Sequence, residues 1–320
     1  MAENIHKMQL SIIIVNRNTS DLLIGCLSKI FESELDNRPQ VIVIDNGSTD
    51  GSIAVIRDLF PEVIAFEAGK NLGFAAANNL GFTMSSAEFV LLINTDALLE
   101  KDCVSKMLDL ARSDDRIALI GPQLLNRDGT NQTSYEATPT LLTETTSRSL
   151  LKRLFPKRYP GKHERLCGPT DVETLIGAVM LIRRKAFDQA GGFDPRYFFF
   201  FEETDLAVRF RLAGWRVVHE PTARATHLQG GSAKSSRAAA RIEFYRSRYI
   251  FFDKLYGPVS KNLLKTVVMF NLGLNVIIYG TINFVTLGFS KEIREKLEVW
   301  SALWMWHLRG CPDGYGLPRN

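Results

Sequence analysis

Polar side chains stand at the ends of three apolar segments in the first hundred residues. Asn16 follows SIIIV, Asp45 ends VIVID, and Asp96 comes just after FVLLIN. If these segments are strands of one parallel sheet, the three side chains lie along its carboxyl edge, where such sheets bind ligands. Asp45 is then placed to accept hydrogen bonds from a base or ribose. Asp96 is placed to offer a hard oxygen ligand to Mg²⁺ or Mn²⁺ held by a diphosphate.

A second group of acidic residues follows four consecutive phenylalanines. Glu202, Glu203 and Asp205 open a predicted helix directly after FFFF. Acids in a first helical turn are favoured by the helix dipole, so capping alone is one interpretation. An apolar wall beside a carboxylate also raises its pKa and suits it to take a proton. The segment is therefore a candidate for a catalytic base.

The elements that must position these side chains alternate between strand and helix. Strands are predicted over residues 11–15, 41–45, 63–66, 89–94, 117–120, 172–184 and 216–220. Helices are predicted over residues 22–31, 73–82, 101–112, 202–213 and 238–256. Short apolar strands that do not alternate, separated by helices, indicate a parallel sheet covered on both faces. Residues 126–169, rich in Thr, Ser, Pro and basic residues, are predicted to form a mobile loop region.

The composition narrows the class of protein. The chain has 320 residues, 45% hydrophobic and 23% charged, which suits one large α/β domain with an appendage or two modest domains. A net charge of +4 gives no reason to expect a nucleic-acid partner. Basic residues cluster in 148–165 and 224–254, and such clusters face phosphates or anionic lipid, or are simply solvated. Four scattered cysteines and an N-terminus without an apolar signal core favour a reduced cytoplasmic setting.

Two common nucleotide-binding motifs are missing from the sequence. The first predicted strand is not followed by G-x-G-x-x-G, and no G-x-x-x-x-G-K-[ST] occurs, which argues against nicotinamide oxidoreductases and P-loop phosphotransferases. A nucleotidyltransferase would need a basic phosphate-binding loop after the first strand, where VNRNTSD supplies only Arg17. A non-catalytic module that binds a sugar or a lipid carrier through a degenerate site is the other alternative.

Several motifs occur in a characteristic order between residues 9 and 256: SIIIVNRNTSDLLIGCL, VIVIDNGSTDGS, NLGFAAANNLGF, LLINTDALLE, GAVMLIRRKAFDQAGGFDPRYFFFFEETDLAVRFRLAGW and ATHLQGGS. Together they resemble family 2 glycosyltransferases, and most of all the rhamnosyltransferase-like group. The resemblance implies a GT-A fold, an α/β domain with a doubly wound, mostly parallel sheet over residues 1–256. Its donor half is expected at about 9–125, its acceptor half at about 170–256, and a C-terminal helical appendage at 257–320.

The resemblance also implies a reaction and its participants. A family 2 enzyme moves a sugar from a nucleotide diphosphate to an acceptor hydroxyl with inversion, assisted by Mg²⁺ or Mn²⁺. The best candidate donor is dTDP-rhamnose, which would supply L-rhamnose. The expected acceptor is an oligosaccharide or lipid-linked saccharide of O-antigen or cell-wall polysaccharide synthesis.

Site residues carry over from the resemblance position by position. Asp45 corresponds to the aspartate that reads the pyrimidine base. NTD stands where the family has Asp-X-Asp, so Asp96 alone keeps the metal-binding carboxylate, and His227 matches a downstream histidine that completes the metal site. The base falls at Glu203, where the family has aspartate, and Glu202 and Asp205 are predicted to bind the acceptor. The other predicted nucleotide-sugar positions are Asn16, Asn71, Gly73, Asn78 and Asn94.

One apolar tract lies near the C-terminus. No charged residue occurs between Lys265 and Lys291, and the tract is long enough to span a bilayer. Three asparagines weaken a spanning interpretation, and basic residues flank the tract on both sides. We therefore expect these helices at the cytoplasmic face of the cell membrane, embedded at the interface or re-entrant, with the preceding basic helix on anionic lipid. A buried helical hairpin in a soluble protein is the alternative.

Overall fold

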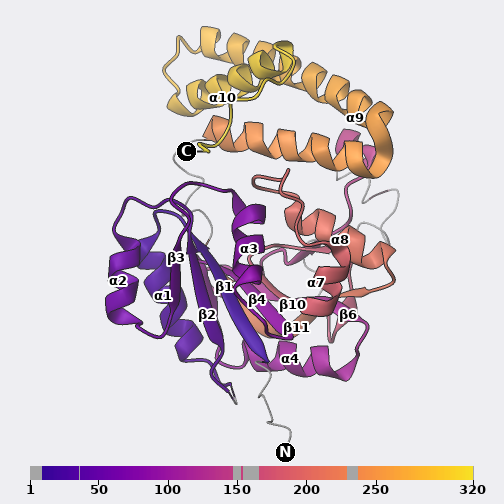
Figure 1. Ribbon diagram of the computed structural model, residues 1–320. Coiled ribbons are helices and arrows are strands. Elements are labelled where there is room, and N and C mark those ends of the chain that lie inside the picture. The colour runs from indigo at the N-terminus through magenta and orange to yellow at the C-terminus, as the bar shows by residue number, and fades with distance from the viewer. Residues whose placement is uncertain (1–8, 36, 147–152, 154–165, 229–236, 320) are drawn as a thin grey trace, which may run out of the picture.

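A mixed sheet of nine strands forms the centre of the protein (Figure 1). The computed structural model describes residues 9–35, 37–146, 153, 166–228 and 237–319. The strand order is β3-β2-β1-β4-β10-β6-β11-β5, and β8 pairs with β11. The strands are β1 (Leu10–Asn16), β2 (Gln40–Asp45), β3 (Ile64–Glu67), β4 (Phe89–Asn94), β5 (Ala97–Leu99), β6 (Ile117–Leu125), β8 (Thr170–Asp171), β10 (Val179–Arg183) and β11 (Arg216–His227).

The sheet is mostly parallel, as the sequence predicts. Strands β3, β2, β1 and β4 are parallel, and β6 is parallel to β11. Strand β10 runs antiparallel between β4 and β6, and the short β5 and β8 run antiparallel to β11. The sheet is therefore mixed towards one edge, while its donor half keeps the predicted parallel arrangement.

Helices cover both faces of the sheet. Helices α1 (Ser20–Phe31), α2 (Ser52–Leu59) and α4 (Cys103–Ser113) pack on one face. Helices α3 (Phe74–Thr83), α7 (Arg184–Ala190) and α8 (Glu202–Leu212) pack on the other. Strand β1 shows the reason, because Ile12 and Ile14 enter the first core while Ile13 enters the second. An apolar strand without a polar face requires cover on both sides.

The predicted long strand over 172–184 is wrong. The chain forms β9 (Thr174–Leu175) and then β10, with Gly177 between them. Strand β9 pairs with β7 (Tyr135–Glu136) in a separate two-stranded sheet, whereas β10 belongs to the central sheet. The chain must pass from one sheet to the other, so one continuous strand is excluded.

The strand predicted over 216–220 is too short. Strand β11 continues to His227, across a register shift between Glu220 and Arg224. Pro221 lies in this irregular segment, where a missing backbone N–H is tolerated. The continuation matters because it brings His227 to the sheet edge.

Residues 126–146 are more regular than the predicted loop, because they include β7 and α5 (Leu141–Thr145). The basic cluster at 148–165 lies outside the described residues, except for Arg153.

A helical unit of α9 (Arg237–Val285) and α10 (Lys291–Leu308) lies across the sheet's carboxyl edge (Figure 1). Helix α9 bends at Gly257, whose φ is 81°, and its second segment folds back over the first. Leu264 and Val268 after the bend share one core with Phe252 before it and Trp306 of α10. The bend coincides with the predicted boundary at 256, but the core crosses it, and the division into 1–256 and 257–320 stays a prediction.

The second segment of α9 exposes many apolar side chains. By length and composition, the helix over residues 238–285 is able to cross a bilayer. Only 17% of its most apolar stretch of 18 residues is buried within the protein. A composition of this kind is weak evidence for a span. The residues exposed at the far end of the segment, here called the apolar tip, are Ile277, Ile278, Ile282, Phe284, Val285, Leu287 and Phe289.

Candidate active site

Asn16 and Asp45 lie side by side at the carboxyl ends of β1 and β2. The Asn16 Nδ2 donates to Asp45 Oδ1 at 3.0 Å and to Ser52 Oγ at 2.8 Å. The backbone N–H of Ser48 donates to the other Asp45 oxygen at 2.9 Å. Asn16 is fully buried, so within the described structure it holds Asp45 in place, and its own contact with a donor stays a prediction.

A threonine pair extends this network towards β4. The Thr19 hydroxyl donates to Asn16 Oδ1 at 2.8 Å and lies 3.0 Å from the Thr95 hydroxyl. Thr95 immediately precedes Asp96 in the chain. The polar groups of three strand ends therefore form one connected line, from the predicted base-reading aspartate to the predicted metal ligand.

Asn71 and Gly73 connect the donor half to the aromatic segment before α8. Asn71 Oδ1 accepts from the Asn46 amide at 2.9 Å and from the Gly73 N–H at 3.1 Å, and its Nδ2 donates to the Pro318 carbonyl at 2.6 Å. Gly73 has a φ of 82°, and a Cβ there would lie 2.5 Å from the Phe198 carbonyl oxygen. Glycine is thus required both by the backbone conformation and by the close approach.

Asp96 and His227 come together through the register of two strands. His227 of β11 pairs with Ala97 of β5, and the Leu228 N–H donates to the Asp96 carbonyl at 2.9 Å. The His227 Nε2 lies 3.5 Å from Asp96 Oδ1. The prediction that these two residues share one site therefore agrees with their placement, while metal binding stays untested.

A hydrogen bond fixes the orientation of the His227 ring. Its Nδ1 lies 2.8 Å from Gln132 Oε1, and the Gln132 amide nitrogen donates to Asn126 Oδ1 at 3.0 Å. With its amide nitrogen so engaged, Gln132 presents an acceptor to the Nδ1 side of the ring and leaves Nε2 directed at Asp96. Such an outer hydrogen bond is usual for a metal-binding histidine.

The donor set at Asp96 and His227 fits a divalent ion that is also held by substrate. The described residues contain no group of three or more His, Cys, Asp or Glu side chains able to hold a metal. Mg²⁺ in nucleotide sites is bound through one or two carboxylates together with substrate phosphates. One carboxylate and one imidazole therefore suffice only when a diphosphate supplies the remaining ligands.

The predicted base opens helix α8 after an unusual backbone turn. Phe200 and Phe201 both have left-handed conformations, with φ of 71° and 67°. Such conformations cost energy in residues with side chains and need support from their surroundings. Phe244 of α9 provides it, with ring centroids 5.6 Å from Phe200 and 5.4 Å from Phe201. Aromatic packing against α9 thus fixes the direction in which α8 begins.

Glu202, which is buried, and Glu203, which is half-buried, form an acid pair at this turn. One carboxyl oxygen of each, Oε2, is buried without a hydrogen-bond partner. Burial, and then the charge of Glu203, raise the pKa of Glu202 well above its usual range. Burial raises the pKa of Glu203 to about 6, with a further contribution from the charge of Glu136. Glu202 therefore holds a proton and donates a hydrogen bond to Glu203, which ionises near neutral pH.

A short path joins this acid pair to Asp96. The Glu203 side chain packs against Gly177, where a Cβ would lie 3.5 Å from the Glu203 Cγ. The carbonyl of the next residue, Ala178, accepts from the Asn94 N–H at 2.9 Å. Asn94 ends β4 two residues before Asp96. The break between β9 and β10 thus brings the acid pair to the strand end that leads to the predicted metal ligand.

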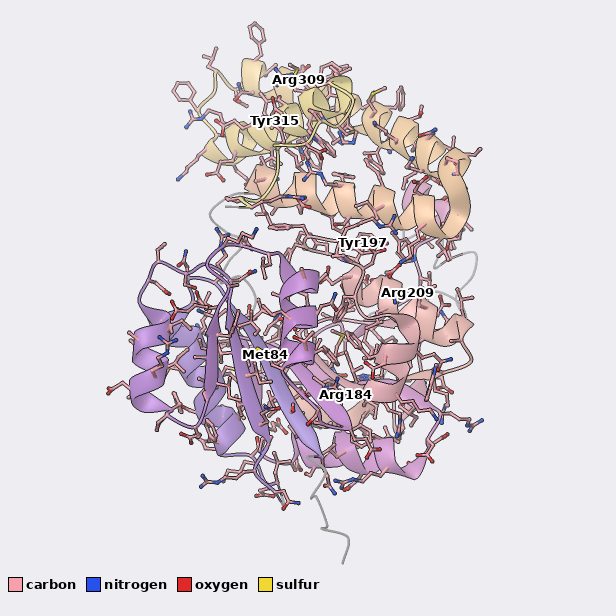
Figure 2. The ribbon with its side chains drawn as sticks, in the orientation of Figure 1. Met84, Arg184, Tyr197, Arg209, Arg309 and Tyr315 are labelled. Atoms are coloured by element: carbon pink, nitrogen blue, oxygen red, sulfur yellow. The ribbon has the colours of Figure 1, made fainter. Side chains whose placement is uncertain are left out.

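Two predicted site residues are engaged within the protein. Asp205 is buried and forms ion pairs with Arg209 at 2.7 Å and Lys254 at 2.8 Å. Tyr197 and Arg209 lie close beneath α9 in Figure 2, and the Tyr197 hydroxyl donates to Asp205 at 3.3 Å. Asn78 is also buried, and its amide donates to the Phe74 carbonyl within α3. Acceptor and donor contacts by Asp205 and Asn78 stay predictions.

Comparison with known proteins decides the family. Residues 11–191 match the family model described as glycosyl transferase family 2. The chain belongs to glycosyltransferase family 2. This glycosyltransferase is 32% identical over 227 residues to the N-acetylglucosaminyl-diphospho-decaprenol L-rhamnosyltransferase of Mycobacterium tuberculosis, covering 66% of this chain and 73% of that protein. It is 24% identical to a low-salt glycan biosynthesis hexosyltransferase of Haloferax volcanii, covering 89% and 86%.

Solved structures confirm the predicted GT-A fold of the glycosyltransferase. A mannosyltransferase from Pyrobaculum calidifontis in complex with GDP-Man and Mn²⁺ aligns with a TM-score of 0.57 at 15% identity, over 95% of this chain and 86% of that one. GalNAc-T7 with UDP, GalNAc and Mn²⁺ aligns with a TM-score of 0.56 at 14% identity, over 78% and 48%. At these identities the likeness establishes the fold.

Sequence reasoning missed several residues that build the glycosyltransferase site. Thr19, Asn46, Ser48, Ser52 and Gln132 bond to predicted site residues, and Thr95 bonds to Thr19. Ser48 and Ser52 fall within the GSTDGS turn and Thr95 within NTD, so proximity to Asp45 and Asp96 was an available signal. Gln132 carried no such signal, because it approaches His227 only through the fold.

Proposed function

We propose that this glycosyltransferase inverts the anomeric centre and is assisted by Mg²⁺ or Mn²⁺. The observation that carries the proposal is the Glu202–Glu203 acid pair, whose Glu203 side chain packs on Gly177, next to the residue that bonds to the strand end at Asn94. A carboxylate with a pKa of about 6 is well matched to proton abstraction near neutral pH. A non-catalytic binding module would have no need for such an acid pair after a strained turn at Phe200 and Phe201.

The proposed reaction is a single displacement. Glu203 accepts the proton of the acceptor hydroxyl as that oxygen attacks the anomeric carbon from the face opposite the nucleotide. The bond to the nucleoside diphosphate breaks with its electron pair, so no covalent enzyme intermediate forms. Asp45 orients the base of the donor, and Glu202, protonated, keeps Glu203 in position. A divalent ion held by Asp96 and His227 would offset the negative charge that develops on the departing diphosphate.

The relatives support a proposal for the donor and the acceptor. The mycobacterial relative is named as an L-rhamnosyltransferase acting on N-acetylglucosaminyl-diphospho-decaprenol. We infer dTDP-rhamnose as the donor and a lipid-linked saccharide as the acceptor, in the synthesis of a cell-surface polysaccharide such as O-antigen or cell wall. The assignment is tested by mixing the protein with a lipid-linked N-acetylglucosamine and dTDP-rhamnose, UDP-N-acetylglucosamine or GDP-mannose, with Mn²⁺ or with chelator.

The expected result is release of nucleoside diphosphate from dTDP-rhamnose alone, and only with metal and acceptor present. If another donor turns over faster, the proposed sugar is wrong but the proposed reaction stands. Binding of donors without any release would favour the non-catalytic module instead.

A location at the cytoplasmic face of the cell membrane fits this acceptor. The apolar tip exposes Phe284 and Phe289 by 80% and 84%, and Lys291 and Arg294 follow directly. Apolar side chains beside basic ones suit the interface of an anionic bilayer. Sedimentation with anionic vesicles is expected for the native protein, and its loss is expected after Phe284→Glu and Phe289→Glu. A native protein that stays in the supernatant contradicts the membrane proposal.

A further inference from the structure

A cavity of about 560 Å³ lies within the helical unit, between the two segments of α9 and α10. Ala240, Arg241 and Phe244 line it from the first segment of α9, and Tyr279 lines it from the second. Its volume falls within the range of sites that bind small molecules. None of the residues predicted to bind the donor, the metal or the acceptor lines this cavity.

The walls of the cavity suit an amphipathic anion. Phe200, Phe244, Tyr279 and Trp300 give aromatic surface, while Arg241 and Lys296 bring positive charge. The Lys296 ammonium lies 5.8 Å from the Tyr279 ring centre and pairs with Glu292 in an exposed ion pair. The one acidic lining residue, Glu295, has its charge partly offset by Lys291 at 3.9 Å.

One wall of the cavity adjoins the apolar tip. Tyr279 lies on α9 between Ile278 and Ile282, which are 52% and 38% exposed. An acyl or isoprenoid chain in a membrane under the tip would therefore meet the Tyr279 side of the cavity.

The opposite wall of the cavity belongs to the aromatic segment that precedes α8 and the predicted base. Phe200 lines the cavity and stands two residues before Glu202. Its left-handed backbone is held by packing on Phe244, which is itself a lining residue. The cavity thus joins the membrane-facing surface to the turn that carries the base.

We propose that this cavity binds the phosphate-bearing, lipid-proximal part of the acceptor, an isoprenoid diphosphate. The inference rests on the proposed function, since it concerns how the lipid-linked saccharide reaches Glu203. Arg241 and Lys296 bind the diphosphate, and the aromatic walls hold the first isoprenoid units. A water-soluble saccharide has no group that would use either feature.

The test compares two acceptors that carry the same sugar. One is linked through a diphosphate to an isoprenoid chain, and the other is a short alkyl glycoside without phosphate. Arg241→Gln and Lys296→Gln together remove the charge, and Ala240→Phe fills the cavity without changing charge. Lys29→Gln is the matched control, because its side chain lies on α1, pairs with Glu32 and does not line the cavity. Thermal unfolding confirms that each variant is folded.

Both cavity variants are expected to raise KM for the lipid-linked acceptor by at least about tenfold, the scale of a lost charge-assisted hydrogen bond. The KM for the alkyl glycoside and the Kd for the donor should stay unchanged, and Lys29→Gln should match the native enzyme. Equal KM values for native and variant enzymes, or equal losses with both acceptors, overturn the cavity assignment alone. A native enzyme that transfers to neither acceptor refutes the proposed function and the cavity assignment together.

Discussion

The raised pKa of Glu203 predicts how activity depends on pH. For a group with a pKa of about 6, about 9% is ionised at pH 5 and about 91% at pH 7, so kcat/KM should rise about tenfold between them. Glu203→Gln keeps the shape of the side chain and removes the base. Turnover should fall by a hundredfold or more, and the residual rate should no longer follow this ionisation.

A remote substitution tests the physical cause of this pKa. The charge of Glu136, on β7, raises the pKa of Glu203. Glu136→Gln should therefore move the rising part of the pH profile to lower pH, while the rate at pH 8 stays close to that of the native enzyme. Donor affinity measured at pH 5 and pH 7 shows whether binding of the metal or the donor, rather than the ionisation of Glu203, changes with pH.

The assay is the initial rate of nucleoside diphosphate release at fixed metal concentration from pH 5 to pH 8. A native profile that is flat between pH 5 and pH 7 would refute the assignment of Glu203 as the base. A larger loss from Glu202→Gln than from Glu203→Gln would move the role to the neighbouring residue.

Further substitutions test how the site residues affect stability, and how the predicted metal ligand and the predicted base-reading aspartate affect donor binding. Glu203→Gln should raise Tm at pH 7. The pKa of Glu203 is higher in the folded state than the ordinary value of 4.5, so its ionisation at neutral pH opposes folding, and glutamine removes this cost. The gain in Tm should vanish below pH 4.5, where the carboxyl group is protonated in both states. Gly73→Ala should lower the free energy of unfolding by at least about 1 kcal/mol, whereas Gly51→Ala, with a similar φ but open space, should cost less. Asp96→Ala should abolish turnover and make donor affinity by calorimetry equal in Mn²⁺ and in chelator. Asp45→Asn should weaken donor binding about tenfold and also lower Tm, because both buried Asp45 oxygens accept hydrogen bonds.

The donor half of the fold follows from local sequence signals. The strands that end at Asn16, Asp45 and Asn94 are continuous apolar runs, and such runs occur where a parallel sheet is covered on both faces. Each run ends at a polar residue, so the carboxyl edge and its ligands could be predicted before the fold was known.

The acceptor half of the fold depends on contacts that no local sequence pattern reveals. The approach of Phe198 to Gly73 and of Gln132 to His227 joins segments about a hundred residues apart. The Gly177 break inside an apolar run and the irregular segment at Pro221 both run against simple strand patterns. These departures place Glu203 and His227, so the sequence could propose residues for the site but not the geometry that brings them together.

The central claim is a single displacement at the anomeric carbon, with Glu203 as the base. Its most direct test is ¹H NMR of the purified product, which gives the anomeric configuration of the transferred sugar and, by comparison with the donor, the stereochemical outcome. A single displacement predicts a product whose configuration is opposite to that of the nucleotide sugar. A product with the donor's own configuration would require a second displacement or a covalent intermediate and would contradict the account.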